Sequence, residues 1–199
     1  MNYLEQMGIV GYLLLACSII SLAVILERLI FFLYNHPISE KWIIGLLQLQ
    51  THALPEDLTQ ELQHKRFGRI ILELFSQRTM DPEERESLLS LRLLEVQSEL
   101  SRYLQLLKIL ASISPLLGLL GTILGMIRSF DAIAQVQGPI TPSVIASGIS
   151  QAMLTTAAGL LIAIPSLLAY SLFQMRAASL MNSLTRQLNL LNQHIKHRG

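Results

Sequence analysis

The chain has 199 residues, of which 51% are hydrophobic and only 15% are charged, and its formal net charge is +1. A soluble domain usually carries about 25% charged residues, so this composition, with a mean hydropathy of +0.47, argues against an ordinary soluble domain. The single cysteine, Cys17, excludes an intrachain disulfide and a metal site built from several cysteines.

The first long apolar segment covers residues 8–33, and its first charged residues are Glu27 and Arg28 near its end. A helix needs roughly 20 apolar residues to span a bilayer, so this segment is long enough. The residues before it contain Glu5 and no Lys or Arg, unlike the basic start of a cleavable signal peptide. We therefore expect an uncleaved membrane anchor.

The region after this anchor has the start signals of several helices. Ser39 and Pro55 precede two short candidates, and residues 67–78 form a third with apolar residues on one face. Asp81 and Pro82, followed by two acidic residues, indicate a helix start, because an N-cap, a proline and acidic side chains all favour that end. No Gly or Pro interrupts residues 83–114, which predicts one helix continuing into the next span.

Two further spans follow, at residues 109–134 and 143–175. Between residues 109 and 175 only Arg128 and Asp131 are charged, yet both spans contain Gly, Ser, Thr and Gln. Such residues inside a membrane segment usually mark helix contacts or a polar pathway. After the third span, apolar residues recur at intervals of three and four, which predicts a helical tail with a coiled-coil-like seam: Met181, Leu184, Leu188, Leu191 and Ile195.

Basic residues give the expected orientation. The turn at residues 135–142 has no Lys or Arg, whereas the opposite span ends are flanked by Arg28, Lys41, Arg102, Lys108, Arg176 and Arg186. Basic residues favour the cytoplasmic side, so we expect the N-terminus outside and the C-terminus in the cytoplasm.

The sequence thus predicts an all-α membrane protein in which the second and third transmembrane helices extend into a helical cytoplasmic domain. Its expected parts are an outside N-terminus with the first transmembrane helix (1–34), a cytoplasmic helical region (35–108), the second transmembrane helix (109–134), an outer turn (135–142), the third transmembrane helix (143–175) and a cytoplasmic helical tail (176–199).

Small residues in the two later spans predict close helix packing, since glycines let helix backbones approach each other. The residues concerned are Gly118, Gly121, Gly125, Gly148 and Gly159. Pro115 and Pro165 each free a backbone carbonyl and permit a kink, with a hinge as the alternative. Arg128 and Asp131 are three residues apart, which favours an ion pair at the membrane interface over a role in ion entry.

Polar residues at similar depth are candidates for an ion path. Gln151 and Thr155 are one turn apart and share a helix face, whereas Thr156 points roughly 140° away from Gln151 at about 100° per residue. Thr122 on the second span is a candidate neighbour of Thr156. Each threonine alone is more simply explained by a bond to the carbonyl four residues earlier. The four residues together favour a shared polar lining.

No set of residues typical of an enzyme, a metal site or a cofactor site is apparent, and no basic patch supports nucleic-acid binding. His194 and His197 are three apart in a polar terminus, which is a weak pattern for a metal site.

The segments LLGLLGTILGMIRSF and GISQAMLTTAAGLLIAIPSLLAY, joined by a short outer turn, resemble the MotA/TolQ/ExbB proton-channel family. Three spans with an outside N-terminus are similar to its ExbB and TolQ branch. The resemblance implies a pentameric ring in a bacterial inner membrane, enclosing transmembrane helices of a smaller ExbD-like or TolR-like partner. It implies that proton flow at the boundary drives a TonB-like or TolA-like periplasmic protein.

By the same resemblance, Thr122 and Thr156 match functional threonines of the second and third spans. Gln151 falls where well-known ExbB and TolQ proteins carry Glu, so this subunit would not supply a titrating carboxylate there. The resemblance favours an ExbB-like motor subunit for TonB-dependent outer-membrane transport. A TolQ-like subunit of the Tol–Pal system and a non-conducting membrane scaffold are the alternatives.

Overall fold

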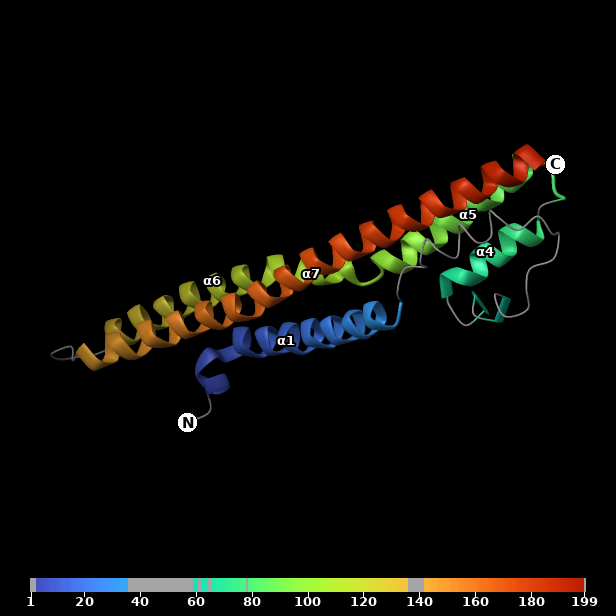
Figure 1. Cartoon of the computed structure of the whole chain (residues 1–199). Coiled ribbons are helices and arrows are strands. Elements are labelled where there is room, and N and C mark those ends of the chain that lie inside the picture. The colour runs from blue at the N-terminus through green and yellow to red at the C-terminus, as the bar shows by residue number, and fades with distance from the viewer. Residues whose placement is uncertain are drawn as a thin grey trace. The chain divides into compact units, whose positions relative to one another are not determined.

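The computed structural model describes residues 3–35, 59–60, 62–63, 66–77, 79–135 and 142–198. Its main elements are the helices α1 (Tyr3–Tyr34), α4 (Arg66–Ser76), α5 (Pro82–Ser101), α6 (Leu104–Ala134) and α7 (Pro142–Arg198) (Figure 1). Segments long and apolar enough to cross a membrane lie at Gly8–Tyr34, Pro82–Ala134 and Gly148–Ile195. The protein is therefore an all-α membrane protein, as predicted. The helix starts predicted at Ser39 and Pro55 lie outside the described residues.

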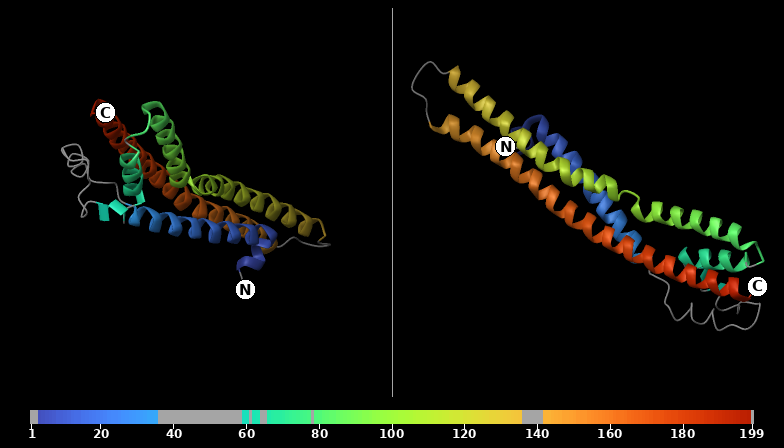
Figure 2. Two further views of the ribbon diagram at one scale, coloured as in Figure 1. Left: turned by 90° about the vertical axis from the view of Figure 1, so that its right-hand side faces the viewer. Right: turned by 90° about the horizontal axis from the view of Figure 1, so that it is seen from above.

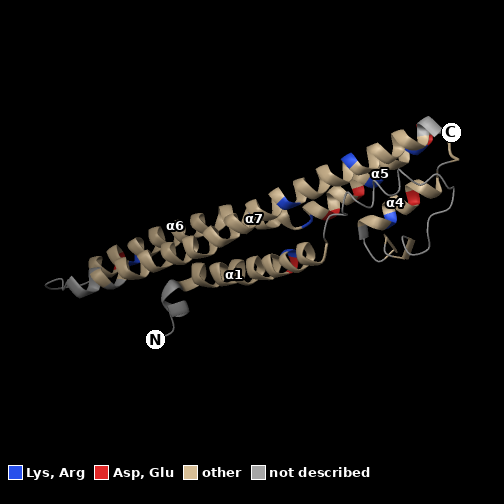
Figure 3. Cartoon of the chain, in the orientation of Figure 1, with Lys and Arg blue, Asp and Glu red and all other residues tan. Residues whose placement is uncertain are grey.

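The chain divides into two compact units, which we name the span unit (residues 1–29 and 103–172) and the stalk unit (residues 30–102 and 173–199). In the span unit, α6 and the first part of α7 lie side by side and run in opposite directions (Figure 2). Along α6 in this unit, few residues are coloured as charged and most are tan, the colour of all other residues (Figure 3). This pattern fits a segment that crosses lipid, because charged side chains are costly there.

Small side chains form the buried face of α6 in the span unit. Its buried positions between residues 111 and 129 recur every three or four residues and are Ala111, Ser114, Gly118, Gly121, Gly125 and Ser129. On α7 the buried residues are similarly small: Ala152, Thr155, Ala163 and Ser166. Large apolar side chains point outward instead, and Leu161 and Phe130 are 75% and 70% exposed. The helices therefore bury their small residues and leave their bulky apolar residues for lipid or for other chains.

The stalk unit has a more ordinary hydrophobic core. Helix α4 buries Phe67, Ile71 and Leu74, and α5 buries Leu89, Val96 and Leu100. Of the predicted seam in the tail, Leu184, Leu188 and Leu191 are buried. The Nε of Arg85 on α5 donates to the Oδ1 of Asn192 on α7 over 2.8 Å.

The predicted start of α5 is confirmed by its cap. The Asp81 side chain accepts a hydrogen bond from the backbone N–H of Glu83 at 3.1 Å, and Pro82 is the first helical residue. Two acidic residues, Glu83 and Glu84, occupy the first turn, where the helix dipole favours negative charge.

The prediction of one uninterrupted helix from residue 83 to 114 is wrong at one point. Helix α5 ends at Ser101, and α6 begins at Leu104 after Tyr103, whose φ of 61° is left-handed. Within the span unit the Arg28 guanidinium carbon lies 5.4 Å from the centre of the Tyr103 ring. No Gly or Pro in the sequence marks this break. A contact with Arg28, a residue distant in sequence, accompanies it instead.

Candidate functional site

Helices α6 and α7 approach each other so closely that several positions have no room for a side chain. A Cβ atom at Gly159 would lie 2.6 Å from the backbone oxygen of Ser114, and one at Gly118 would lie 3.0 Å from the Cα of Thr156. Gly121 and Gly125 face Thr155 and Ala152 in the same way, and Gly148 faces Ser129. All five glycines singled out in the sequence therefore lie where the two helices touch.

This close approach brings Thr122 and Thr156 into direct contact. Their hydroxyl groups form a hydrogen bond with each other. The Thr122 hydroxyl is also 3.1 Å from the backbone oxygen of Ala152 on α7, and the Thr156 hydroxyl is 3.1 Å from the backbone oxygen of Gly118 on α6. Thr122 also lies 3.2 Å from Gly118 O on its own helix. Each threonine thus reaches the carbonyl four residues before the other threonine.

The two threonine hydroxyls have one hydrogen each, and more acceptor oxygens lie within reach than these two hydrogens can bond. Each hydroxyl donates one hydrogen bond and accepts up to two. If Thr122 donates to Thr156, then Thr156 donates to Gly118 O; if Thr156 donates to Thr122, then Thr122 donates to Ala152 O or Gly118 O. Rotation of the two hydroxyls interconverts these arrangements without moving a backbone atom. The pair can therefore reverse the direction in which it donates.

Gln151 and Thr155 lie together at a second polar position. With Val10 of α1 and with Gly121, Leu124, Gly125 and Arg128 of α6, they line a cavity of about 10 Å³. The Thr155 side chain is 1% exposed, and its hydroxyl donates to Ala152 O at 2.7 Å. The structure therefore groups the four predicted ion-path residues as two pairs, Thr122 with Thr156 and Gln151 with Thr155.

Arg128 and Asp131 differ from the sequence prediction. Among the residues that the structure describes, no ion pair joins these two side chains, so the predicted interfacial pair is wrong. The Arg128 guanidinium lies instead against Gly8 of α1, where a Cβ atom would be 3.0 Å from Nη1. Gly8 has φ 60° and ψ −149°, a backbone conformation that other residues rarely adopt. The guanidinium thus occupies space that opens where α1 changes direction.

A buried serine pair, not predicted from the sequence, joins α1 to α7. The hydroxyl oxygens of Ser21 and Ser166 are 2.5 Å apart, and Ser166 also donates to Ile162 O at 2.6 Å. Ser166 follows Pro165, which lies inside α7, as Pro115 lies inside α6. The available signal was a hydroxyl residue within an uncharged apolar run, the same signal that drew attention to the threonines.

Across the described ranges, no three His, Cys, Asp or Glu side chains are grouped so that they could hold a metal ion. The polar groups described in the span unit include the Thr122–Thr156 and Ser21–Ser166 hydroxyl pairs and the small cavity that Arg128 helps to line. Neutral donors and acceptors inside apolar helices suit the transfer of a proton or the solvation of an ion.

Residues 54–186, more than half of the chain, match the model of the MotA/TolQ/ExbB proton channel family. The chain belongs to this family. It is 35% identical over 193 residues to the biopolymer transport protein exbB1 of Vibrio cholerae, covering 94% of this chain and 85% of that protein. It is 31% identical over 192 residues to the putative biopolymer transport protein ExbB-like 3 of Synechocystis, covering 92% and 90%.

A shorter similarity reaches the other branch that the sequence motif suggested. The Tol-Pal system protein TolQ of Pseudomonas aeruginosa is 39% identical over 84 residues, which are 42% of this chain and 36% of that protein. The family predicted from the residues of the second and third spans is thus confirmed. This MotA/TolQ/ExbB family protein is a multi-pass membrane protein of a proton-channel family, which is not a class of enzymes.

Proposed function

We propose that this protein is an ExbB-like motor subunit of the bacterial inner membrane. It forms an oligomeric ring, a pentamer, around an ExbD-like single-span partner and couples proton flow to a TonB-like protein that energises outer-membrane transport. Its N-terminus is periplasmic and its C-terminus cytoplasmic. The proposal is supported by the extent of the similarity to the Vibrio cholerae biopolymer transport protein, which covers 94% of this chain.

The single observation that carries the mechanism is the Thr122–Thr156 hydroxyl pair. It lies between two apolar helices, and both side chains are part-buried, so they are not sealed inside the protomer. The transported proton binds a carboxylate on the partner helix, and the threonine hydroxyls donate to that carboxylate or accept from it. Since the pair can reverse its donors by rotation alone, it serves the protonated and the ionised carboxyl equally well.

The driving force is large enough for such a device. One charge crossing a potential of about 100 mV releases roughly 2.3 kcal/mol. That free energy shifts an equilibrium between two arrangements by about fifty-fold. The five glycines at the contact between α6 and α7 hold these two helices together, which leaves the boundary with the partner helix as the place where movement occurs.

A ring also accounts for the surface of the span unit. Large apolar side chains on all three spans are exposed, together with the polar Ser150 and Gln135 near the outer ends. Neighbouring copies and a partner helix would cover part of this surface. Native mass spectrometry in mild detergent should therefore detect a homo-oligomer, and a protein that is monomeric while fully active would contradict the ring.

Removal of the hydroxyls tests the proposed path. The protein is produced with its partner in a strain lacking its own ExbB and TolQ systems, and TonB-dependent uptake is measured. Thr122→Val and Thr156→Val retain side-chain volume and remove the hydroxyl, so each should reduce uptake more than oligomer yield. Ser112→Ala is the matched control, because the Ser112 hydroxyl on α6 is exposed and donates to Lys108 O on its own helix at 3.0 Å. Full uptake by both valine variants would remove the threonines from the path.

The similarity to TolQ favours a second candidate, a subunit of a Tol–Pal system. Rescue of envelope integrity without rescue of TonB-dependent uptake would support that branch. A scaffold that only assembles its partner would give normal complexes but no proton flux in proteoliposomes.

A further inference from the structure

The cavity beside Gln151 is lined by an unusual combination of groups for membrane-spanning helices, of which Thr155 is buried, Gln151 half-buried and Arg128 exposed. Its lining comprises one cationic side chain (Arg128), one neutral amide (Gln151), one hydroxyl (Thr155) and otherwise apolar side chains or glycine. Among the residues that the structure describes, none forms a hydrogen bond with the Gln151 side chain, which is only partly exposed. Its amide atoms retain some accessible surface, so water can supply the partner that the chain does not.

The size of the cavity suits one small polar molecule. A space of about 10–15 Å³ is enough for one water, provided that two to four polar groups surround it. The cavity has about 10 Å³, and three residues of its lining, Arg128, Gln151 and Thr155, carry polar groups that include both donors and acceptors. Because the Thr155 hydroxyl donates its hydrogen to Ala152 O, its oxygen can still accept a hydrogen bond.

We propose that this cavity is a water-binding site and that the Arg128 guanidinium and the neutral Gln151 amide face each other across it. The water donates to the Gln151 carbonyl oxygen or to Thr155 Oγ1 and accepts from Arg128 or from the Gln151 amide. The guanidinium provides the only formal charge among the described residues of the lining, and the neutral amide keeps that charge without a counter-ion in the cavity. This arrangement is internal to one protomer and does not depend on which periplasmic system the protein energises.

The nearby Arg128 explains why a neutral Gln and not an ionised Glu suits residue 151 in this chain. Arg128 is exposed in the single chain, and a carboxylate at residue 151 would attract its charge across the cavity that both residues line. An ion pair between them would displace the water and link α7 firmly to α6 at the point where both meet α1. In this protomer the amide avoids that link.

A double-mutant cycle tests the charge pairing on the purified oligomer by thermal unfolding in detergent. Gln151→Glu should raise the midpoint by about 2–4 °C when Arg128 is present, the shift that about 1 kcal/mol produces in a chain of this size. In an Arg128→Gln background the same substitution should lower the midpoint. Equal effects of Gln151→Glu in both backgrounds would show that Arg128 does not face residue 151 and would overturn the pairing.

Two further variants keep the test decisive. Gln151→Lys places a like charge beside Arg128, so it should be destabilising with Arg128 and less so with Arg128→Gln, even if Gln151→Glu fails to accumulate. Ser150→Glu adds a carboxylate at the neighbouring exposed position, and its effect should be the same in both backgrounds. Because unfolding is measured and not uptake, a failure here is distinguishable from a failure of the proposed motor function.

The water itself is tested by a high-resolution single-particle map of the wild-type oligomer and of Val10→Leu. The wild-type map should contain one ordered water between Gln151 and Thr155, and the larger leucine should remove it by filling the cavity. A wild-type map that resolves other internal waters but has no density at this point would overturn the water site.

Discussion

Ser21 of α1 and Ser166 of α7 share a buried hydrogen bond, with their hydroxyl oxygens 2.5 Å apart. Because Ser166 also donates to Ile162 O on its own helix, the arrangement that uses every hydrogen has Ser21 donating to Ser166. Ser21 and Ser166 are 3% and 0% exposed, so neither hydroxyl has water as an alternative partner. The bond therefore links α1 to α7 at one defined point.

This arrangement predicts unequal effects of two alanine substitutions. Ser166→Ala removes the acceptor of Ser21 and should cost about 1–3 kcal/mol, the cost of a buried group left unsatisfied. Ser21→Ala leaves Ser166 bonded to Ile162 O and should cost about 1 kcal/mol or less. Thermal unfolding of the purified oligomer measures both. A larger cost for Ser21→Ala would reverse the assignment of donor and acceptor.

The hydrogen bonds of Thr122 and Thr156 across the two helices predict that valine substitutions at these residues have non-additive effects on stability. Each valine substitution removes the shared hydrogen bond, so the second substitution has less to remove than the first. The double variant should therefore be destabilised by less than the summed effect of the single variants, with a coupling of about 0.5–3 kcal/mol. Additive effects in the same unfolding assay would indicate that each hydroxyl is bonded only to its own helix.

Much of the fold was predictable because the membrane imposes strong rules on composition. Three apolar segments gave the spans, and Asp81 with Pro82 gave the start of α5. The angular argument also separated Gln151 from Thr156, and the structure indeed places them in different contacts. These features depend on local composition or on the geometry of one ideal helix.

The features that were missed depend on contacts between helices. The break at Tyr103 has no turn residue, and its ring meets Arg28 from a distant part of the chain. The spacing of Arg128 and Asp131 on one helix predicts that they pair, whereas the Arg128 guanidinium lies against Gly8 on another helix. The partnership of Ser21 with Ser166 required the register of α1 against α7, which no local pattern specifies.

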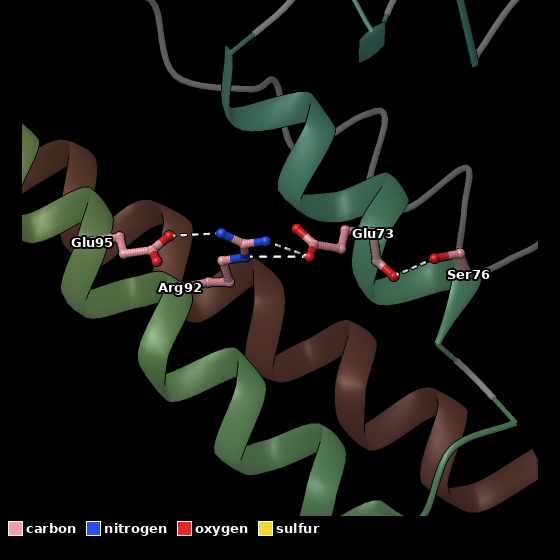
Figure 4. Close-up of polar contacts among 4 residues, drawn as sticks. All are labelled: Glu73, Ser76, Arg92 and Glu95. Carbon is pink, nitrogen blue, oxygen red and sulfur yellow. Dashed lines mark hydrogen bonds and ion pairs between the residues drawn. The ribbon is translucent and has the colours of Figure 1, made fainter.

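In the stalk unit, Arg92 of α5 lies between two carboxylates (Figure 4). Its Nη2 is 2.8 Å from Glu73 of α4, and its Nη1 is 2.8 Å from Glu95 one turn along α5. The hydrogen bond that Arg92 donates to Glu73, and then the one that it donates to Glu95, raise the pKa of Arg92 above its ordinary range. A cation whose pKa is raised on folding contributes fully at any pH below its ordinary pKa and loses that contribution only above it.

Arg92→Gln should therefore change the unfolding midpoint by the same small amount at about pH 6 and at about pH 9, since arginine stays charged throughout this range. The difference from wild type should shrink as salt is added, because the side chains are exposed and salt screens them. A difference that grows steadily between the two pH values would mean that another titrating group controls this contact.

Tyr103 combines a left-handed backbone with a ring beside the Arg28 guanidinium, and substitutions can separate the two. Tyr103→Phe keeps the ring and should unfold within a degree or two of wild type. Tyr103→Ala loses the ring contact and still carries a Cβ at φ 61°, so it should be the least stable variant. Tyr103→Gly loses the same contact, but glycine adopts positive φ readily. Its free energy of unfolding should therefore be about 1–2 kcal/mol higher than that of Tyr103→Ala. Alanine as stable as glycine would mean that the left-handed conformation at residue 103 is not retained in the membrane-embedded protein, because only that conformation distinguishes the two.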